Sequence, residues 1–217
     1  MDPLEMAVKV ALFFVPFLFA LCFHEFAHGF VAKLRGDDTA EMMGRLTMNP
    51  LAHVDWIGTV GLPIVAILTG MPLFGWAKPV PVNSRNLKDP KNDMFWVALA
   101  GPLSNILLFV LGLVATFVVF RVLRVPLNSP LFEMLKMFLY INLLLAFFNM
   151  LPLHPLDGGK VLQRFIPYHW NRWLEDHQYH LNMALLLLII SGGFSVLARP
   201  ILYIMQTSLT LVLTGAV

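Results

Sequence analysis

The chain contains 217 residues, of which 58% are hydrophobic and only 13% are charged. Soluble domains carry about 25% charged residues, so this composition indicates a membrane protein. The formal net charge of +2, without a basic stripe interleaved with aromatic residues, gives no indication of a nucleic-acid partner. The single cysteine, Cys22, excludes an internal disulfide framework and a four-cysteine zinc site.

Several apolar runs are long enough to be membrane helices, which need about 20 mostly apolar residues. In chain order the strong candidates are 7–34, 95–120, 134–151 and 181–198, and the weaker ones are 57–71 and 200–216. We therefore expect an α-helical polytopic membrane protein with about five to six transmembrane helices. Residues 1–217 would form one membrane-embedded domain, with a core over about 7–165 and C-terminal helices over about 181–216.

Two short segments predict extended backbone. Residues 44–50 end at a proline, and residues 74–82 contain Pro79 and Pro81, which forbid a regular helix and tolerate only an edge strand. Extended backbone at membrane depth persists only where it is buried in protein or faces water. We expect a small membrane-associated β-sheet beside a polar cavity. The side chain of Lys78 would either reach the interface or line that cavity.

The first apolar run contains the sequence HEFAH, a His-Glu-x-x-His motif at His24, Glu25 and His28. Histidines four residues apart share one helix face, so both imidazoles can reach one zinc ion, with the glutamate beside it as general base. A chance match is the alternative. An acid at the centre of a membrane helix costs about 2.5–3.5 kcal/mol on insertion scales, which favours a functional site.

A catalytic zinc ion needs a third protein ligand and one open position. The candidates in or beside apolar surroundings are His53, Asp55, His154 and Asp157. Asp157 follows a helix that prolines interrupt, and it precedes two glycines that permit close backbone approach. An Asp-Gly pair often forms only a turn, but beside a buried metal motif the ligand interpretation is favoured.

Three motifs in this order resemble the site-2 protease family of intramembrane zinc metalloproteases: HEFAH (24–28), GPLSN (101–105) and NMLPLHPLDGG (149–159). The sequences GRLTMNPLAHVDWIGT and GWAKPVPVNSRN are similar to the small prokaryotic branch, which lacks PDZ and CBS domains. The resemblance runs from about residue 20 to 165. It implies a zinc metalloendopeptidase that cleaves a transmembrane protein substrate in the lipid bilayer.

The resemblance also implies roles for individual residues. His24, His28 and Asp157 would hold one zinc ion per chain, and Glu25 would activate the water. Asn149 would lie near the metal as a further catalytic residue. The remaining motif residues would contact the substrate: Gly101, Pro102 and Asn105 in the middle helix, with Pro79 and Pro81 in the extended segment.

Other polar residues have two interpretations each. His53 and Asp55 could orient a metal ligand, but a helix start with Asp55 as N-cap is favoured. His154 could donate a hydrogen bond near the site or face the water interface. Asn142, seven residues before Asn149, could line a cavity or bond a neighbouring helix. The segment 168–180, with His169, His177 and His180, could bind a second metal, although an interfacial aromatic segment is favoured.

The metal motif and Asp157 can meet only if the C-terminal ends of runs 7–34 and 134–151 face the same side. Residues 35–94 must then start and finish on that side, so 57–71 either returns through 74–82 or is re-entrant. That side carries nine basic residues: Lys33, Arg35, Arg45, Arg85, Lys88, Lys91, Lys160, Arg164 and Arg172. The opposite side carries four, or five if Lys136 is counted there: Lys9, Arg121, Arg124 and Arg199. The positive-inside rule predicts a multi-pass cell-membrane protein with its site toward the cytoplasm.

Two non-enzymatic alternatives remain, a catalytically silent zinc-binding membrane protein and a metal transporter. The intact Glu25 argues against the first. Transporters often contain paired repeats with broken helices, and the sequence contains no visible repeat. The sequence does not indicate the substrate or the oligomeric state.

Overall fold

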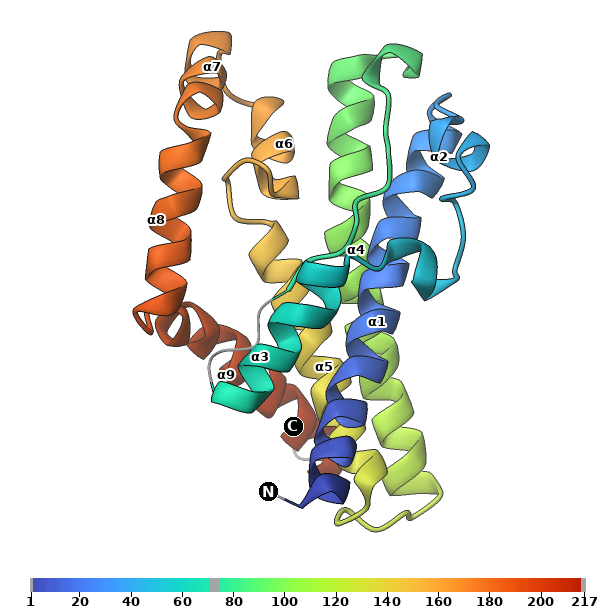
Figure 1. The fold of residues 1–217 in the computed structure, drawn as a ribbon. Helices are drawn as coiled ribbons and strands as arrows, with labels where there is room; N and C mark the ends of the chain where they lie inside the picture. Colours follow the sequence, from blue (N-terminus) through green and yellow to red (C-terminus); the bar gives the residue numbers. More distant parts are fainter. Residues whose placement is uncertain (1, 71–74, 216–217) are drawn as a thin grey trace.

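The computed structural model describes residues 2–70 and 75–215, which form an almost wholly helical structure (Figure 1). Three long helices form its centre: α1 (Pro3–Leu34), α4 (Pro90–Phe117) and α5 (Pro130–Asn149). A π-helical turn, η4 (Val118–Val122), extends α4. Within the described residues, these three helices are long and apolar enough to cross a membrane, and they pack against one another.

Polar caps and prolines explain why the central helices begin earlier than their apolar runs. The Asp89 side chain accepts the Asn92 N–H, and Pro90 occupies the first turn of α4. Likewise, α5 begins at Pro130 rather than at residue 134. After α1, the chain turns at Gly36, whose φ of +108° suits glycine.

Two buried apolar clusters hold the helices together. The first joins α1 to α5 and to the extended segment after α3, through Phe13, Phe17, Ala20, Leu21, Ala77 and Ile141. The second joins α4 and α5 to the last helix, α9 (Phe194–Thr214), through Phe109, Leu139, Met205 and Leu209. Between helices that cross a membrane, such clusters stabilise the structure through close van der Waals packing, because lipid is as apolar as the side chains themselves.

Short elements fill the region between α1 and α4: α2 (Thr39–Met42), η1 (Pro50–His53), η2 (Trp56–Gly61), α3 (Leu62–Thr69) and η3 (Ser84–Asn86). The continuous helix over η2 and α3 covers residues 56–69, about 21 Å at 1.5 Å per residue, which is less than the hydrocarbon thickness. After the undescribed residues 71–74, the chain returns along α1 to the end where α4 begins (Figure 1). The segment between α1 and α4 thus starts and finishes at the same end of the molecule, and the two alternatives for 57–71 stay predictions.

The predicted small β-sheet is not confirmed, since the described residues contain no β-strand. Residues 44–50 form turns and bends, and 75–82 are extended without a ladder. The amides of the extended segment are bonded elsewhere: Trp76 N–H donates to the Gly58 carbonyl, and Lys78 N–H to the His53 carbonyl. Pro79 and Pro81 have no N–H to donate, so a regular ladder cannot form there.

The C-terminal helices differ most from the sequence expectation. They are α6 (Asp157–Gln163), α7 (Tyr168–Asp176), α8 (Gln178–Ile190) and α9. The run 181–198 is divided, because the chain turns after α8 at Gly192, which has a φ of +85°. As a result α9 begins at residue 194 instead of 200, and α8 is too short to span. The predicted five to six spans are therefore not confirmed in the described part of the chain.

Candidate metal centre

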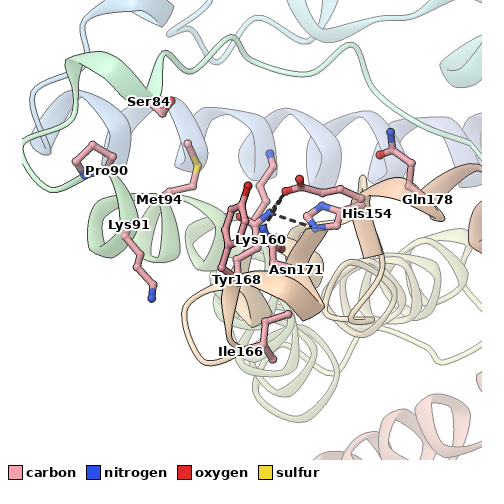
Figure 2. A pocket seen from close by; sticks show the side chains of 12 residues that line it. Ser84, Pro90, Lys91, Met94, His154, Lys160, Ile166, Tyr168, Asn171 and Gln178 are labelled. Carbon is pink, nitrogen blue, oxygen red and sulfur yellow. Dashed lines mark hydrogen bonds between the residues drawn. The ribbon is translucent and has the colours of Figure 1, made fainter. Parts of the chain in front are cut away.

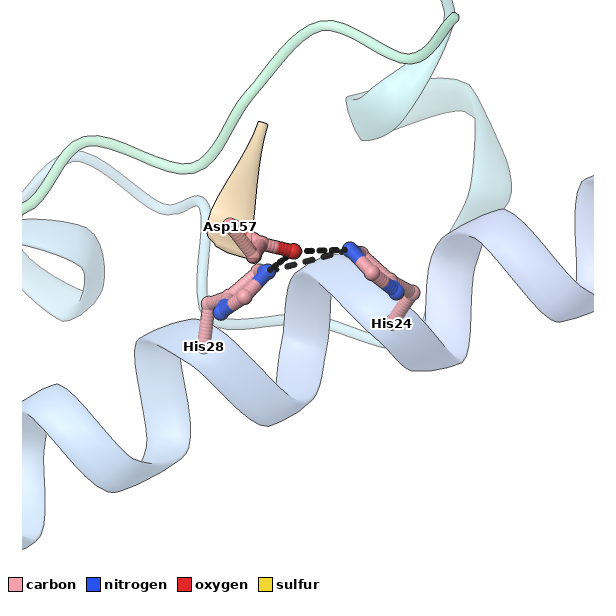
Figure 3. Close-up of side chains that lie close together, drawn as sticks. All are labelled: His24, His28 and Asp157. Carbon is pink, nitrogen blue, oxygen red and sulfur yellow. Dashed lines mark hydrogen bonds and ion pairs between the residues drawn. The ribbon is translucent and has the colours of Figure 1, made fainter. Parts of the chain in front are cut away.

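Three ligand atoms converge between α1 and the start of α6 (Figure 3). His24 Nε2 and His28 Nε2 lie 3.0 Å apart. Asp157 Oδ2 lies 3.2 Å from each of these nitrogen atoms. All three residues are buried, with exposed fractions of 4%, 9% and 7%.

The hydrogen bonds behind the imidazoles make all three converging atoms acceptors. His24 Nδ1 faces Asn105 Oδ1 at 2.6 Å, and His28 Nδ1 faces the Val97 carbonyl at 2.7 Å. Each Nδ1 must therefore carry a proton, which leaves each Nε2 with a lone pair.

A cation is the group that such an arrangement fits. Three acceptors at this separation repel one another unless a positive charge lies between them, and Asp157 Oδ2 has no conventional hydrogen-bond partner. Tetrahedral zinc with ligands at 2.0–2.1 Å would separate neighbouring ligand atoms by about 3.3 Å. The observed separations of 3.0 and 3.2 Å are close to this value. Two imidazoles and one carboxylate are also a donor set that zinc accepts.

Glycines allow close packing behind the two histidines and beside Asp157. A side chain at Gly101, on α4, would lie 2.4 Å from His28 Nε2 and 2.6 Å from His24 Nε2. One at Gly158 would lie 2.4 Å from the Met150 and Leu151 carbonyls. Because real Cβ atoms do not come this close, glycine is required behind the histidines and beside Asp157.

Glu25 lies beside the three ligands and is held by the extended segment. The Val80 N–H donates to Glu25 Oε2 at 2.8 Å. Val80 packs against Gly29, where an added Cβ would lie 3.1 Å from Val80 Cγ1. Gly29, which directly follows the metal motif on α1, therefore sets how closely the extended segment approaches Glu25.

Two cavities meet at Glu25. One has a volume of about 560 Å³, is mainly apolar, and lies between α1, α5, α8 and residues 75–79. The other has a volume of about 450 Å³ and contains the three ligand residues. His24, Glu25, Pro79 and Asn149 line both cavities.

A third, polar cavity of about 650 Å³ lies near the start of α4, α6 and α7 (Figure 2). It shares Met94 and Lys160 with the metal cavity. Gln163 bridges His154 Nε2 and Glu175 Oε1, both at 3.2 Å. The three cavities therefore adjoin one another, from α8 through the metal centre to α7.

The structure separates the residues expected to contact substrate into two groups. Pro79 lines the cavities at the metal centre together with Asn149, the further catalytic residue expected there, whereas Pro81 is half-buried. Gly101, Pro102 and Asn105 are buried and pack behind the histidines. Asn105 has no exposed surface, and its Oδ1 lies against His24 Nδ1.

The residues with two interpretations are placed away from the ligand atoms. Asp55 caps η2 by accepting the Ile57 and Gly58 N–H groups, as the favoured interpretation predicts. His53 bonds the Thr47 carbonyl at 2.9 Å, and His154 lines the polar cavity.

The His-rich segment also lies apart from the metal centre. His177 stacks on Trp173 with ring centroids 4.4 Å apart, within a largely exposed aromatic stretch. Among the described residues, the triad of His24, His28 and Asp157 is the one His/Cys/Asp/Glu group that converges tightly enough to hold a metal.

Sequence reasoning missed some contributors to the site. The Val80 and Val97 contacts use backbone atoms, which side-chain patterns do not reveal. Asn182, on α8, lines the apolar cavity. A lone amide in an apolar run was the available signal for it, since such residues in membrane helices commonly bond or face a cavity.

Comparison with known proteins agrees with this geometry. The model of peptidase family M50 matches residues 125–191. YwhC from Bacillus subtilis is 40% identical over 147 residues, 66% of this chain and 64% of the relative. Rip2 from Mycobacterium tuberculosis is 30% identical over 191 residues, 88% of this chain and 71% of the relative. The chain belongs to peptidase family M50.

The M50 relatives YwhC and Rip2 are both named for a zinc metalloprotease activity. A third relative, the zinc metalloprotease MJ0392 from Methanocaldococcus jannaschii, is 29% identical over 119 residues, 54% of this chain and 33% of the relative. The chain thus spans about two thirds of YwhC and one third of MJ0392. No solved structure gives a significant match.

Proposed function

We propose that this M50 protein is a zinc metalloprotease that hydrolyses a peptide bond within or near a transmembrane segment of a membrane protein. The observation that carries the proposal is the convergence of three buried ligand atoms beside Glu25, in a helix able to span a membrane. Membership of the M50 family and the names of its relatives support it.

The residues at the centre divide the chemistry between them. Zinc, when held by His24, His28 and Asp157, supplies a Lewis acid that acidifies water and polarises a carbonyl group. Glu25 accepts the proton of the attacking water as its oxygen bonds to the carbonyl carbon, and it delivers that proton to the amine as the C–N bond breaks. The Val80 N–H holds one Glu25 oxygen and leaves the other for proton transfer.

The apolar cavity suits an unwound stretch of a transmembrane helix. A helix conceals its carbonyl groups in its own hydrogen bonds, so the substrate must open locally before attack. Its freed polar groups then need partners, since an unpaired peptide group in apolar surroundings costs several kcal/mol. Asn149 and Asn182 supply side-chain amides on opposite walls of this cavity. Asn149 also borders the metal cavity, and this position supports a role in binding the reacting carbonyl group.

The polar cavity offers the hydrolytic water a route. It adjoins the metal cavity at Met94 and Lys160 and contains His154, Asn171 and Glu175 (Figure 2). Water entering there reaches Glu25 without crossing the apolar cavity. The excess of basic residues at this end of the molecule, under the positive-inside rule, favours a cytoplasmic opening.

The proposal is tested with two variants in detergent-purified protein. In Glu25→Gln we expect about one zinc per chain to remain, while cleavage of a helix-broken transmembrane substrate falls by about 10²–10⁴-fold. In Asp157→Ala we expect zinc to be lost together with cleavage. Metal content is measured by mass spectrometry and cleavage by gel assay.

These variants also separate the rival functions. If Glu25→Gln kept full cleavage, or if the wild type bound zinc and cleaved no helix-broken substrate, the protease proposal would fail. A zinc carrier would retain its transport in Glu25→Gln, because the three ligands remain. A wild-type protein without zinc after zinc-supplemented growth would leave the ligand assignment without support.

A further inference from the structure

Two buried asparagines that are not metal ligands bear on which ring nitrogen of His24 carries the proton. His28 needs no such help, because its Nδ1 faces the Val97 carbonyl, which can only accept. The partner of His24 is the Asn105 amide, whose oxygen accepts and whose nitrogen donates. If this amide turned over, its NH₂ group would face His24 Nδ1 and move the imidazole proton to Nε2.

A chain of hydrogen bonds holds the Asn105 amide in one orientation. Asn142, on α5, donates from Nδ2 to the Phe138 carbonyl at 2.8 Å, so its Oδ1 must face the other way. That oxygen accepts from Asn105 Nδ2 at 3.0 Å, which leaves Asn105 Oδ1 directed at His24. Asn105 Nδ2 also faces the Ala20 carbonyl at a longer 3.4 Å.

Burial makes these hydrogen bonds costly to lose. Asn105 and Asn142 have exposed fractions of 0%, so water cannot replace a lost partner. An unsatisfied buried polar group costs about 1–3 kcal/mol, and a turned amide would leave two such groups. The hydrogen bonds behind each histidine thus lead to a backbone carbonyl. For His28 the contact is direct, and for His24 it passes through two side-chain amides.

We propose that Asn142 is a positioning residue for the metal centre, which acts through Asn105 to keep the proton of His24 on Nδ1. The Nε2 lone pair of His24 is then always available to the metal. This proposal rests on the zinc site of the proposed function, but it concerns metal affinity and can be tested without any substrate.

The test compares zinc affinities of metal-free, detergent-purified proteins by competition with a chromophoric chelator. Asn142→Leu removes the nearer of the two acceptors that orient the Asn105 amide, and we expect zinc to bind about 10–100-fold more weakly, as for other groups that orient a metal-bound histidine. Thr116→Val is the matched control. It removes a fully buried polar group from α4 that bonds only its own helix, and its affinity should stay unchanged.

A second substitution distinguishes orientation from packing. Asn105→Asp supplies a carboxylate that can only accept, so His24 Nδ1 must donate to it whatever residue stands at position 142. Adding Asn105→Asp to Asn142→Leu should therefore restore affinity to within about threefold of the wild type, within the usual scatter of such couplings. A merely structural role for Asn142 would not be rescued in this way.

The proposal is overturned if Asn142→Leu binds zinc as tightly as the wild type, or if Asn105→Asp fails to rescue it. If Asn142→Leu does not fold, nitrogen-15 NMR of histidine-labelled, metal-free wild-type protein decides. His24 protonated on Nδ1 supports the proposal, and His24 protonated on Nε2 overturns it. Failure of proteolysis with these affinities as expected would count against the proposed function alone.

Discussion

The wall that holds the metal ligands and the wall that faces them across the apolar cavity are built differently. Behind His24 and His28, α1, α4 and α5 pack closely, and their polar side chains are buried and bonded. On the opposite side, α8 has its main contacts with α7 and α9, its neighbours in sequence, and stands apart from α1 in Figure 1.

Under the proposed function, this difference suits the two walls to separate tasks. Metal ligands must be held to within a fraction of an ångström, which dense packing and buried hydrogen bonds provide. A cavity that admits a peptide from the membrane needs a wall with few constraints, and the inward face of α8 offers Asn182, Leu185 and Ile189. Substitutions in the first wall should therefore change metal binding, and those in the second should change substrate use.

Gly101→Ala should give the largest effect, because it places a methyl group 2.4 Å from His28 Nε2. The histidines must move, and we expect zinc affinity to fall by at least about 10–100-fold, with cleavage falling in parallel. Chelator competition on the purified protein measures the loss.

Gly112→Ala is the matched control on the same helix. Its added methyl group would approach the Leu139 and Phe138 side chains at 2.9 and 3.0 Å, away from the histidines. We expect some loss of thermal stability with unchanged zinc affinity. Equal losses of affinity in both variants would show that α4 packing in general, and not the contact at Gly101, governs the centre.

Asn182→Leu should have an intermediate effect confined to the substrate. Removing one hydrogen bond to an unwound peptide should lower kcat/KM by about fivefold to tenfold, from a net value near 1 kcal/mol. Zinc content should not change. Met183→Leu alters the adjacent, exposed position of α8 and serves as the control. A loss of zinc in Asn182→Leu would contradict the separation of the two walls.

Asp37→Asn should have the smallest effect on activity. It weakens the hydrogen bonds that join the end of α1 to η3, a connection called the tether below. The fully buried Asp37 accepts from the Asn83 N–H at 2.7 Å, from Asn86 Nδ2 at 2.9 Å and from Thr39. We expect a loss of about 1–3 kcal/mol of stability. Asp38→Asn, an exposed neighbour without a side-chain cap bond, should change nothing.

The same tether predicts a pH dependence. Burial acts to raise the pKa of Asp37, but the hydrogen bonds from Thr39, Asn83 and Asn86 outweigh it and lower this pKa. The stabilisation is therefore complete above the ordinary carboxyl pKa of about 3.9 and is lost as the pH falls through the lower folded value. The difference in thermal stability between wild type and Asp37→Asn should be constant near neutral pH and shrink in acid.

The metal ligands could be proposed from sequence because their chemistry is local. His24 and His28 follow helical spacing, and Asp157 is one of few acids in apolar surroundings. The structure brings these three together. Three helices long and apolar enough to cross a membrane could likewise be predicted, because long apolar runs leave few alternatives.

Other features depended on contacts that a sequence does not contain. Asn105 could face a substrate or a neighbouring helix, and only the packing of α1 against α4 decides. The expected sheet failed because the amides of 75–82 bond the η1–η2 region and Glu25 instead of a strand. The run 181–198 looked continuous, yet the turn at Gly192 divides it, since composition does not show where a glycine bends the chain.

The Val80 amide has a practical consequence for spectroscopy. Prolines on both sides leave it as the single N–H among three successive residues, and that N–H donates to Glu25. Its proton chemical shift will therefore follow the charge and position of the glutamate. One labelled valine gives the protein a built-in reporter of its candidate general base, readable before any substrate is known.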